Sequence, residues 1–373
     1  MPTYLLRLNL DIKERNFKDQ LRFKLAAASV KSLSKKNNKV VILSHLGRPQ
    51  AKNLSHSALT LKPFARALSQ VAGKKIKFIS HFNFPKIKDE IDRASGGSIF
   101  LLENLRFLPG ENKNSPILAK QLAGLGNRYI NDDFANSHRA HTSMNAITKF
   151  LPSSAGPLVK EEIRALQTIR SKSSRPFVLV IGGAKMADKI VLMKYLLPKV
   201  DYILVGGGPA NNFLELKRVD IGSSIHEPKL TRTTRLLARN KKLIIPVDWK
   251  KERNKILDIG PETVKIYSKI IADAKTIIWN GPMGYFEDEK FAVGTEKIAK
   301  AILKNRRARI VIGGAETIAS LQATTRINAD LSARISADSD RRKSALFLST
   351  GGGAMLAFLA GKKLPGIKTL HLR

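Results

Sequence analysis

Five glycine-rich segments in the second half of this 373-residue chain each follow a short apolar run. They are IGGAK (181–185), VGGGP (205–209), WNGPMG (279–284), VIGGAET (311–317) and STGGGA (349–354). Glycine lets backbone N–H groups approach an anion, and a following helix N-terminus adds favourable partial charge. Tight turns also use glycine, but five such segments favour nucleotide binding over packing turns. Neither the P-loop pattern nor the dinucleotide fingerprint occurs.

Two lysines follow the first of these glycine segments. Lys185 and Lys189 are four residues apart in GGAKMADKI and would share one helix face if a helix began at the glycines. Two ammonium groups beside a phosphate-binding loop would suit stabilisation of a transferring phosphoryl group. The alternative is that Lys189 pairs with Asp188 or is simply solvated, as most lysines are.

Arginine and histidine take the place of glycine in the first half, within SHLGRP (44–49), LLENLRF (101–107) and SHRAH (137–141). The candidates there are Arg22, His45, Arg48, Arg106, His138 and Arg139. Arginine binds carboxylate and phosphate oxygens in pairs, so such a cluster would suit a small, multiply anionic substrate. Each could equally be a surface arginine or a structural histidine. Asn9 and Asp11 are two apart on the first predicted strand, so they share a face and either bind substrate or end the strand.

Apolar runs typical of buried strands alternate with helical stretches along the chain. In the first half, strands are predicted at Tyr4–Leu10, Lys39–Leu43, Lys75–Ile79, Ser98–Leu102 and Arg128–Asn131, with helices at 18–35, 57–72 and 115–125. In the second half, strands are predicted at Phe177–Ile181, Tyr202–Val205, Thr276–Trp279, Arg309–Ile312 and Ala345–Leu348. This alternation predicts an α/β fold with parallel sheets covered on both faces and ligands at the carboxyl ends of the strands.

Length and periodicity indicate how these elements are divided. A chain of 373 residues is too long for one ordinary core, so we expect two domains. Between the halves, Pro157 suits the first position of a helix, and Val159, Ile163 and Leu166 recur at helical spacing. The helix is either a plain connection or a hinge between two ligand-binding halves.

The charge balance is strongly basic, with 66 Lys+Arg against 30 Asp+Glu and a net charge of +36. Such a field attracts nucleic acid, anionic membrane surfaces or small phosphorylated molecules. The charges are spread along the chain, which is more typical of a solvated surface than of a recognition site. No zinc-finger spacing, RNA-binding aromatic motif or basic zipper accompanies them. The absence of cysteine excludes thiolate chemistry, and no apolar run is long enough to span a membrane.

Taken together, these motifs resemble the phosphoglycerate kinase family along almost the whole chain. They occur in the family's order: SHLGRP, LLENLRF, NDDFANSHRAH, GGAKMADK, VGGGP, LDIGPET, WNGPMGYFE, FAVGTEKIA, GGAET, STGGGA and LPG. The resemblance implies two Rossmann-like parallel-sheet domains joined by a hinge helix, with a cleft between them. It implies a triose-phosphate domain at 1–155, an interdomain helix at 156–170 and a nucleotide domain at 171–356, with the tail 357–373 packing on the first domain.

The resemblance also implies an activity. This is reversible phosphoryl transfer from 1,3-bisphosphoglycerate to Mg-ADP, giving 3-phosphoglycerate and ATP, by a cytoplasmic monomer that binds no membrane and binds nucleic acid at most nonspecifically. One alternative is a divergent family member that binds nucleotide and triose but transfers little. Another is a basic protein whose main partner is nucleic acid, as the net charge would allow.

Site residues follow from the same resemblance. The implied triose site is Asn9, Asp11, Arg22, His45, Arg48, Arg106 and Arg139. The implied nucleotide site is Gly183, Lys185, Lys189, Gly206, Gly207, Gly208, Asn280, Pro282, Glu287, Gly313, Gly314, Glu316, Thr317, Gly351, Gly352 and Gly353. Catalytic roles are implied for Arg22, Lys185, Lys189, Gly314 and Gly352, and Glu316 would engage Mg²⁺ through the metal-nucleotide.

Several positions depart from the family's pattern. The family's R-V-D-F-N is here Arg7-Leu8-Asn9-Leu10-Asp11, with acid and amide exchanged, and Asp133 replaces the alanine of the NDAF motif. The family's GGGDT is here GGAET (313–317), so Ala315 must have a negative φ and Glu316 is one methylene longer than the usual aspartate. Pro209 replaces the usual methionine, and the segment between 248 and 257 is shorter than usual.

Overall fold

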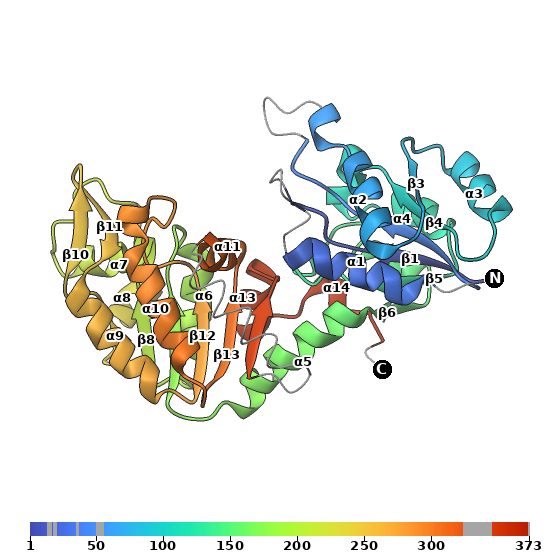
Figure 1. Ribbon diagram of the computed structural model, residues 1–373. Helices are drawn as coiled ribbons and strands as arrows, with labels where there is room; N and C mark the ends of the chain where they lie inside the picture. The colour runs from blue at the N-terminus through green and yellow to red at the C-terminus, as the bar shows by residue number, and fades with distance from the viewer. Residues whose placement is uncertain (13–16, 18–20, 35–36, 50–55, 324–344, 372–373) are drawn as a thin grey trace. The chain divides into compact units, whose positions relative to one another are not determined.

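The computed structural model describes residues 1–373 except 13–16, 18–20, 35–36, 50–55, 324–344 and 372–373 (Figure 1). The described residues fall into two compact units. The first comprises Met1–Glu162 together with Lys363–Arg373, and the second comprises Ile163–Lys362. Among the described helices, none is both long enough and apolar enough to cross a membrane.

The first unit is built on a six-stranded parallel sheet in the order β3-β4-β2-β1-β5-β6. Its strands are β1 (Thr3–Arg7), β2 (Lys39–Leu43), β3 (Ile76–Ile79), β4 (Ile99–Leu102), β5 (Arg128–Asn131) and β6 (Ser153–Ala155). Its α-helices are α1 (Leu21–Leu33), α2 (Lys62–Ala72), α3 (Phe84–Arg93), α4 (Pro116–Ala123) and α14 (Pro365–Lys368). Its 3₁₀ turns are η2 (His56–Leu59), η3 (Leu105–Phe107), η4 (Glu111–Lys113) and η5 (Ala146–Lys149).

The core of the first unit explains why its strands read as continuous apolar runs. Phe23 of α1 and Phe64 of α2 pack with Leu6 of β1 and Ile42 of β2 in one buried cluster. All five residues of β2 are buried, because a parallel sheet is covered on both faces. The sheet therefore holds its carboxyl ends, and the loops that follow them, in fixed positions.

The second unit contains another six-stranded parallel sheet, in the order β14-β13-β12-β7-β8-β9, and a separate hairpin. The sheet strands are β7 (Phe177–Ile181), β8 (Tyr202–Val205), β9 (Leu243–Ile244), β12 (Thr276–Asn280), β13 (Arg309–Gly313) and β14 (Leu346–Ser349), and the hairpin strands are β10 (Trp249–Glu252) and β11 (Lys255–Ile259). The helices are α6 (Ala187–Leu196), α7 (Gly207–Leu216), α8 (Arg232–Ala238), α9 (Pro261–Asp273), α10 (Val293–Lys304), α11 (Ala315–Ala323) and α13 (Gly353–Leu359), with the 3₁₀ turn η6 at Glu289–Phe291.

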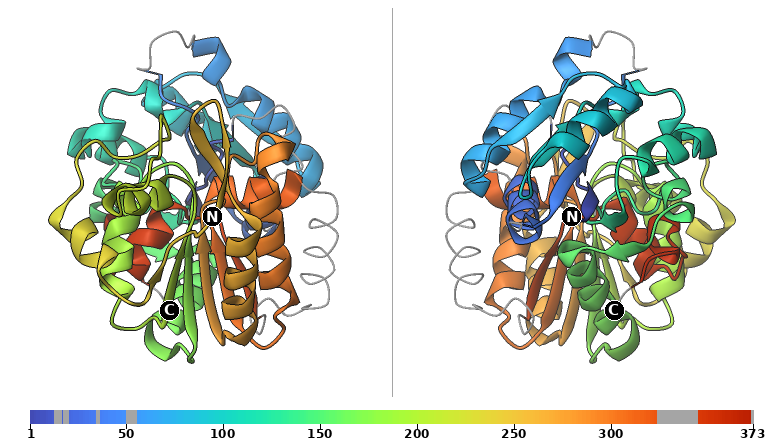
Figure 2. Two further views of the ribbon diagram at one scale, coloured as in Figure 1. Left: turned by 90° about the vertical axis from the view of Figure 1, so that its left-hand side faces the viewer. Right: turned by 90° about the vertical axis from the view of Figure 1, so that its right-hand side faces the viewer.

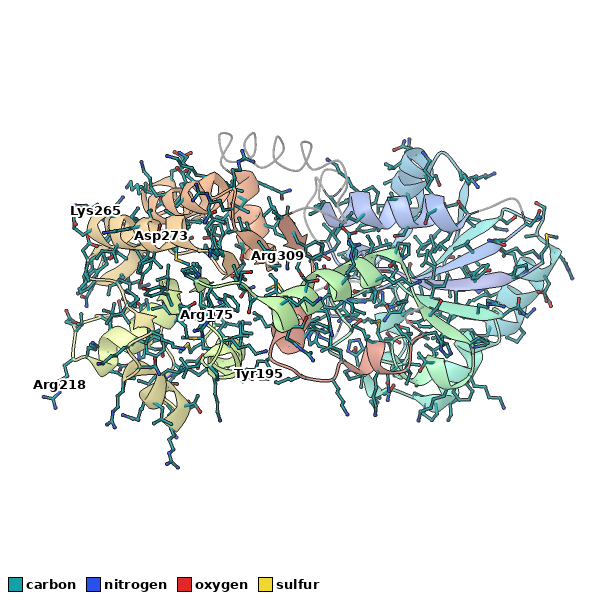
Figure 3. All side chains as sticks on the ribbon, turned by 90° about the horizontal axis from the view of Figure 1, so that it is seen from below. Arg175, Tyr195, Arg218, Lys265, Asp273 and Arg309 are labelled. Carbon is teal, nitrogen blue, oxygen red and sulfur yellow. The ribbon has the colours of Figure 1, made fainter. Side chains whose placement is uncertain are left out.

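Helices cover both faces of this second sheet (Figure 2). Tyr267 of α9 and Ile298 of α10 pack against Trp279 of β12 in one buried cluster, while α6 packs with α8 and α13. The predicted α/β class with two parallel sheets is thus confirmed. Charged side chains such as Arg218, Lys265 and Asp273 lie exposed on this unit (Figure 3), as the spread of charge along the sequence indicated.

Most predicted elements match within two residues at each end, and three differ by more or lie partly outside the described residues. The strand predicted at Tyr4–Leu10 ends at Arg7. The helix predicted at 57–72 is interrupted at Thr60 and Leu61, because the Glu103 carboxylate accepts hydrogen bonds from the Thr60 hydroxyl (2.6 Å) and the Leu61 N–H (2.8 Å), and because Pro63 has no N–H to continue a helix. The helix predicted at 18–35 is α1, and residues 18–20 and 35 lie outside the described residues.

The predicted connecting helix is confirmed as α5 (Pro157–Lys172). It begins in the first unit and continues in the second, with the division between Glu162 and Ile163. Its first turn is capped by Asp132, whose carboxylate accepts from the Leu158 N–H (2.7 Å) and the Val159 N–H (3.2 Å). A carboxylate at a helix N-terminus satisfies amides that lack an intrahelical partner.

The buried Asp132 carboxylate leads to a testable prediction about how the free energy of unfolding depends on pH. Burial disfavours the charged form and raises the pKa of Asp132 to about 6, although Ser29, Val159 and Leu158 donate hydrogen bonds to it. Because the folded pKa exceeds the unfolded one, the contribution of this group to the free energy of unfolding is largest below about pH 4 and falls as the pH rises to about 6, by roughly 3 kcal/mol at most. We expect Asp132→Asn to remove this slope when unfolding is measured between pH 4 and pH 7. Parallel pH profiles for the two proteins would contradict it.

The C-terminal segment is anchored on the first unit by hydrogen bonds. The Asn131 side chain donates to the Gly366 carbonyl (2.7 Å), and the Gly366 N–H donates to the Ser137 carbonyl (2.9 Å). The His371 N–H donates to the Ser153 carbonyl (3.0 Å). The end of the chain therefore supports the loop after β5, which carries predicted site residues.

Candidate active site

The predicted triose-site residues of the first unit follow the carboxyl ends of its strands. Asn9 and Asp11 lie in the segment after β1, not on the strand as predicted, because the ladder ends at Arg7. Burial still alternates there, with Leu8 and Leu10 buried and the two polar residues partly exposed. The Asn9 side chain accepts a hydrogen bond from the Asp11 N–H (3.0 Å), which fixes the local turn.

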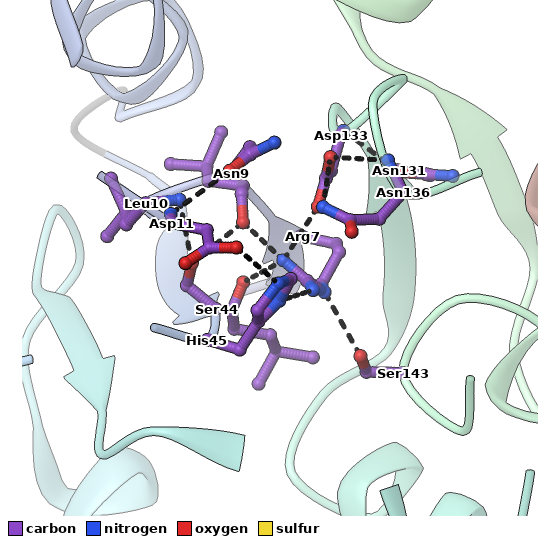
Figure 4. Close-up of polar contacts among 12 residues, drawn as sticks. Arg7, Asn9, Leu10, Asp11, Ser44, His45, Asn131, Asp133, Asn136 and Ser143 are labelled. Atoms are coloured by element: carbon purple, nitrogen blue, oxygen red, sulfur yellow. Dashed lines mark hydrogen bonds and ion pairs between the residues drawn. The ribbon is translucent and has the colours of Figure 1, made fainter. Parts of the chain in front are cut away.

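Asp11 is the point at which several predicted site residues meet (Figure 4). Its carboxylate accepts a hydrogen bond from the Gly47 N–H (2.8 Å). The same carboxylate lies 3.7 Å from Nε2 of His45 and 3.9 Å from Nη1 of Arg106. The backbone carbonyl of Asp11 accepts a hydrogen bond from the Arg22 guanidinium (2.8 Å). The structure thus brings together one carboxylate, two guanidinium groups and one imidazole, a set that can bind an anion carrying a hydroxyl group.

Arg106 is fixed by the turn that carries it. Asn104 accepts from the Arg106 N–H (3.1 Å) and the Leu46 N–H (3.2 Å), so η3 is held against the loop after β2. Nη1 of Arg106 donates to the Gly47 carbonyl. Burial lowers the pKa of Arg106 to about 10, with Asp11 opposing the shift, so the side chain remains a cation at neutral pH. Arg48 lies exposed in the same loop, and no contact of its side chain bears on its predicted role.

Two histidines of this region, His45 and His141, are held neutral by their surroundings. His45 is fully buried, and burial together with Arg7, Arg106, His141 and Arg139 places its pKa well below the usual value. Burial and the neighbouring arginines lower the pKa of His141 to about 4. Arg139 donates to Nε2 of His138 (3.3 Å). The positive charge of the site therefore belongs to arginines and does not change near neutral pH.

Sequence reasoning missed Arg7, which is fully buried at the end of β1. Its guanidinium contacts Asp133 (3.1 Å), Ser143 (3.0 Å) and His45 (2.5 Å). The signal was available, because a charged residue at the carboxyl end of an otherwise apolar strand must find partners there.

In the second unit, the loop after β7 places the two predicted lysines differently. The helix does not begin at the glycines as predicted: α6 begins at Ala187, so Lys185 precedes it and lies exposed. Gly183 has φ +78° and its N–H donates to the Pro282 carbonyl (2.6 Å), which holds the loop against the loop after β12 and delays the helix. Lys189 is buried and its ammonium donates to the Gly182 carbonyl.

Two residues predicted to bind nucleotide form hydrogen bonds to neighbouring loops. Asn280 donates to the Gly313 carbonyl (2.6 Å), and the Thr317 hydroxyl accepts from the Gly281 N–H (2.7 Å). Both side chains are buried. These bonds fix the ends of β12 and β13, and with them Gly314, which has φ +104°.

A cavity of about 580 Å³ opens at the carboxyl ends of β7, β8 and β12 in the second unit. It brings together six predicted residues: Gly183, Gly207, Gly208, Pro282, Glu287 and Glu316. Sequence reasoning missed its apolar lining, which includes Ile225, Ile256, Leu257, Tyr285 and Phe286. An apolar slot beside glycine loops suits a flat heterocyclic base next to a phosphate chain. Ile225 and Tyr285 are 56% and 52% exposed, which is unusual for side chains of their size.

The remaining predicted glycines lie around other loop ends and do not line this cavity. Gly206 precedes α7. Gly351 donates to the Ser349 hydroxyl (3.1 Å), Gly352 has φ +41°, and Gly353 begins α13. α13 begins beyond the carboxyl end of β14, and the Ala354 and Met355 N–H groups in its first turn donate to the Gly351 carbonyl (2.8 and 3.4 Å).

Glu316 and Lys189 both lie beside Gly183. A Cβ built on Gly183 would lie 3.3 Å from Oε2 of Glu316 and 2.8 Å from Nζ of Lys189, so the missing side chain leaves both charged groups facing one small space. No group of three or more metal-ligating side chains occurs among the described residues. One carboxylate fits Mg²⁺, which proteins often hold through one or two carboxylates while nucleotide phosphates and water complete its shell.

The strained Gly314 offers a test of this loop. In Gly314→Ala the new Cβ would lie 2.7 Å from Nδ2 of Asn280, on a backbone with φ +104°. We expect the KM for nucleotide to rise and the free energy of unfolding to fall by about 1–2 kcal/mol. Gly73→Ala is the matched control, because Gly73 also has positive φ (+65°) but has nothing within 4 Å of the added Cβ. Equal nucleotide KM values in the two variants would contradict a role for this loop.

Comparisons with known proteins agree with this geometry. The sequence model of the family described as phosphoglycerate kinase matches residues 4–362. This chain belongs to the phosphoglycerate kinase family. It is 37% identical to the phosphoglycerate kinase of Dictyoglomus turgidum, covering 97% of this chain and 93% of the relative. It is 35% identical to that of a Wolbachia strain from Drosophila simulans, covering 99% and 96%.

Solved structures of the phosphoglycerate kinase family share the fold. The Coxiella burnetii phosphoglycerate kinase is 34% identical with a TM-score of 0.77, covering 99% of this chain and 95% of that one. The Pyrococcus horikoshii enzyme is 28% identical with a TM-score of 0.81, covering 100% and 96%. The predicted family, fold class and kinase activity are thus confirmed.

Three departures from the phosphoglycerate kinase pattern have structural explanations. Ala315 is accommodated because it begins α11, while the positive φ falls on Gly314. Asp133 is buried, and its carboxylate pairs with Arg7. Arg7 lies two residues before Asn9, one of the two exchanged positions. Pro209 lies within the first turn of α7, where a missing N–H is tolerated.

Proposed function

We propose that this chain transfers a phosphoryl group reversibly between 1,3-bisphosphoglycerate and Mg-ADP, with the triose on the first unit and the nucleotide on the second. The observation that carries the proposal is the clustering of Asp11, Arg22, His45 and Arg106 at one sheet edge. This cluster supplies charge for an anion and a carboxylate for a hydroxyl group, in a chain that also has a nucleotide-sized cavity.

On the triose side, Arg106 and Arg139 would bind carboxylate and phosphate oxygens, and Asp11 and Asn9 would bind the hydroxyl group. Arg22 would neutralise charge on the transferring phosphoryl group. Because this transfer needs little covalent participation by the protein, catalysis would consist of positioning, charge neutralisation and exclusion of water.

On the nucleotide side, the apolar cavity would hold the base. Lys189 and Lys185 would contact the phosphates, together with the amides at Gly314 and at the start of α13. Mg²⁺, when bound, would neutralise phosphate charge, and Glu316 would hold it.

The proposal extends to how the two sites meet. In-line transfer requires donor and acceptor oxygens on either side of one phosphorus atom, so the two substrate sites must approach. Since α5 belongs to both units, we propose it as the hinge. We further propose a cytoplasmic monomer, in which nucleic acid binds only through the net charge.

The test is ATP consumption by the purified chain in the presence of 3-phosphoglycerate. We expect turnover that requires both Mg²⁺ and 3-phosphoglycerate and that is absent with 2-phosphoglycerate. ATP hydrolysis independent of 3-phosphoglycerate, or none at all under conditions in which nucleotide binds, would overturn the proposal.

A further inference from the structure

The Arg7 guanidinium is the centre of a buried polar network beneath the triose site (Figure 4). Its exposed fraction is 0%, and Nη1 donates to the Leu8 and Leu43 backbone carbonyls, so its donors are directed to protein groups. Nε donates to the Ser143 hydroxyl (3.0 Å), and that hydroxyl donates to the Glu111 carboxylate (2.6 Å). On the other side, Nη2 contacts Nδ1 of His45 (2.5 Å). Arg7 therefore links the interior of the unit to a predicted substrate ligand.

Asp133 is the carboxylate that pairs with this guanidinium. Its carboxylate is 3.1 Å from Nη1 of Arg7, and both side chains are fully buried. Asn136 donates to the same carboxylate through its backbone N–H (3.1 Å) and its side-chain amide (2.9 Å). The Asp133 N–H donates to the Asn131 side chain (3.0 Å). Every oxygen of this carboxylate is thus held in place before a substrate arrives.

The contact between Arg7 and His45 selects one tautomer of the imidazole. A guanidinium has only donors, so Nδ1 of His45 must accept, and the proton of the neutral ring lies on Nε2. Nε2 has no hydrogen-bond partner within the described part of the chain and lies 3.7 Å from the Asp11 carboxylate. Burial, together with the charges of Arg7, Arg106, His141 and Arg139, lowers the pKa of His45 well below its usual value and keeps the ring neutral.

We propose that Asp133 is a positioning residue for triose recognition: by fixing Arg7 it holds His45 with its Nε2–H ready to donate to an oxygen of the bound triose. The inference rests on the proposed function for the identity of the ligand, but not for the tautomer. A buried ion pair is often neutral for stability, because desolvation offsets attraction. Because the Arg7–Asp133 pair orients His45, it has a role in substrate recognition in addition to any effect on stability.

The first test reads the tautomer without any substrate. The full-length chain labelled with ¹⁵N-histidine would be studied by NMR, with the His45 signals assigned through His45→Gln. We expect the wild type to carry its proton on Nε2 at neutral pH. A proton on Nδ1, or an imidazolium, would overturn the inference, and this outcome does not require enzyme activity.

The second test uses Asp133→Asn, which keeps the size of the side chain and removes its charge. We expect mixed tautomers at His45 and a KM for 3-phosphoglycerate raised about tenfold, the loss of one oriented hydrogen bond, with the KM for ATP unchanged. Asp132→Asn is the matched control, because it removes a neighbouring buried carboxylate whose contacts go to α5. We expect it to leave both the tautomer and the triose KM unchanged.

The outcomes separate the inference from the proposed function. Reduced thermal stability in Asp133→Asn with the His45 tautomer and triose KM intact would show a purely structural role and overturn the inference. If the wild type carries the Nε2 proton and the variant loses it, while neither transfers phosphate, the positioning of His45 by Asp133 holds, and the proposed function and the triose as ligand fail.

Discussion

Lys189→Ala is expected to lower kcat by about 10²–10³-fold, the usual cost of removing one preorganised charged donor from a site of developing charge. The Lys189 ammonium is buried, donates to the Gly182 carbonyl and lies beside the turn at Gly183. It is thus held where nucleotide phosphates would bind before any substrate arrives. Steady-state kinetics of the purified variant, with its fold checked by circular dichroism, would measure the effect.

The control for this prediction is on the same helix. Lys194→Ala removes an exposed lysine from the last turn of α6, so it changes net charge equally without touching the loop. We expect its kcat to match the wild type. An unchanged kcat in a correctly folded Lys189→Ala would remove this lysine from the mechanism.

Arg139→Ala is expected to raise the KM for 3-phosphoglycerate by about 10–100-fold, because a hydrogen-bonded charge pair contributes about 1.5–3 kcal/mol. Arg139 is partly exposed in the loop after β5 and contacts His138. The loop is held by the Gly366 N–H, which donates to the Ser137 carbonyl. Since nothing in this loop belongs to the second unit, the KM for ATP should change little.

Arg128→Ala provides the comparison, because Arg128 lies exposed at the opposite, amino end of β5. It removes the same charge from the same unit, away from the predicted site, and should leave both KM values near those of the wild type. If Arg139→Ala raised the KM for ATP more than that for the triose, the assignment of substrates to units would be reversed.

The parts of the fold that the sequence predicted are those with strong local signals. Apolar runs such as Lys39–Leu43 and Phe177–Ile181 match β2 and β7 residue for residue, because strands buried on both faces leave few polar positions. The glycine loops could also be predicted from a local signal. Glycine at Gly183 or Gly314 is required by a positive φ, which other residues rarely adopt.

What the sequence did not predict depends on contacts between distant segments. The β10–β11 hairpin turns at Arg253 and Asn254, both with positive φ, and arginine is not a residue that indicates such a turn. The start of α6 depends on the Pro282 carbonyl, about a hundred residues away, which holds Gly183 outside the helix. Arg7 could be placed in the site only once β1, β2 and the loop after β5 were known to meet.

The candidate site shows the same division. Motif order indicated His45, Arg106 and Lys189, and the structure gives each of them defined partners. His45 and Arg106 follow the carboxyl ends of β2 and β4, and Lys189 lies in the first turn of α6. The exchange of Asn9 and Asp11 could not be interpreted from the sequence. It becomes intelligible when the Arg7–Asp133 pair is seen, because a carboxylate lies beside Arg7 even though residue 9 is an amide.

The most direct test of the central claim is to trap the product of ATP and 3-phosphoglycerate with hydroxylamine, which converts an acyl phosphate to a hydroxamate. We predict hydroxamate formation that requires the chain, ATP, Mg²⁺ and 3-phosphoglycerate together. It would show that the triose carboxylate is the phosphoryl acceptor. If both substrates bind and no hydroxamate forms, the fold and the family remain, but transfer to that carboxylate is contradicted.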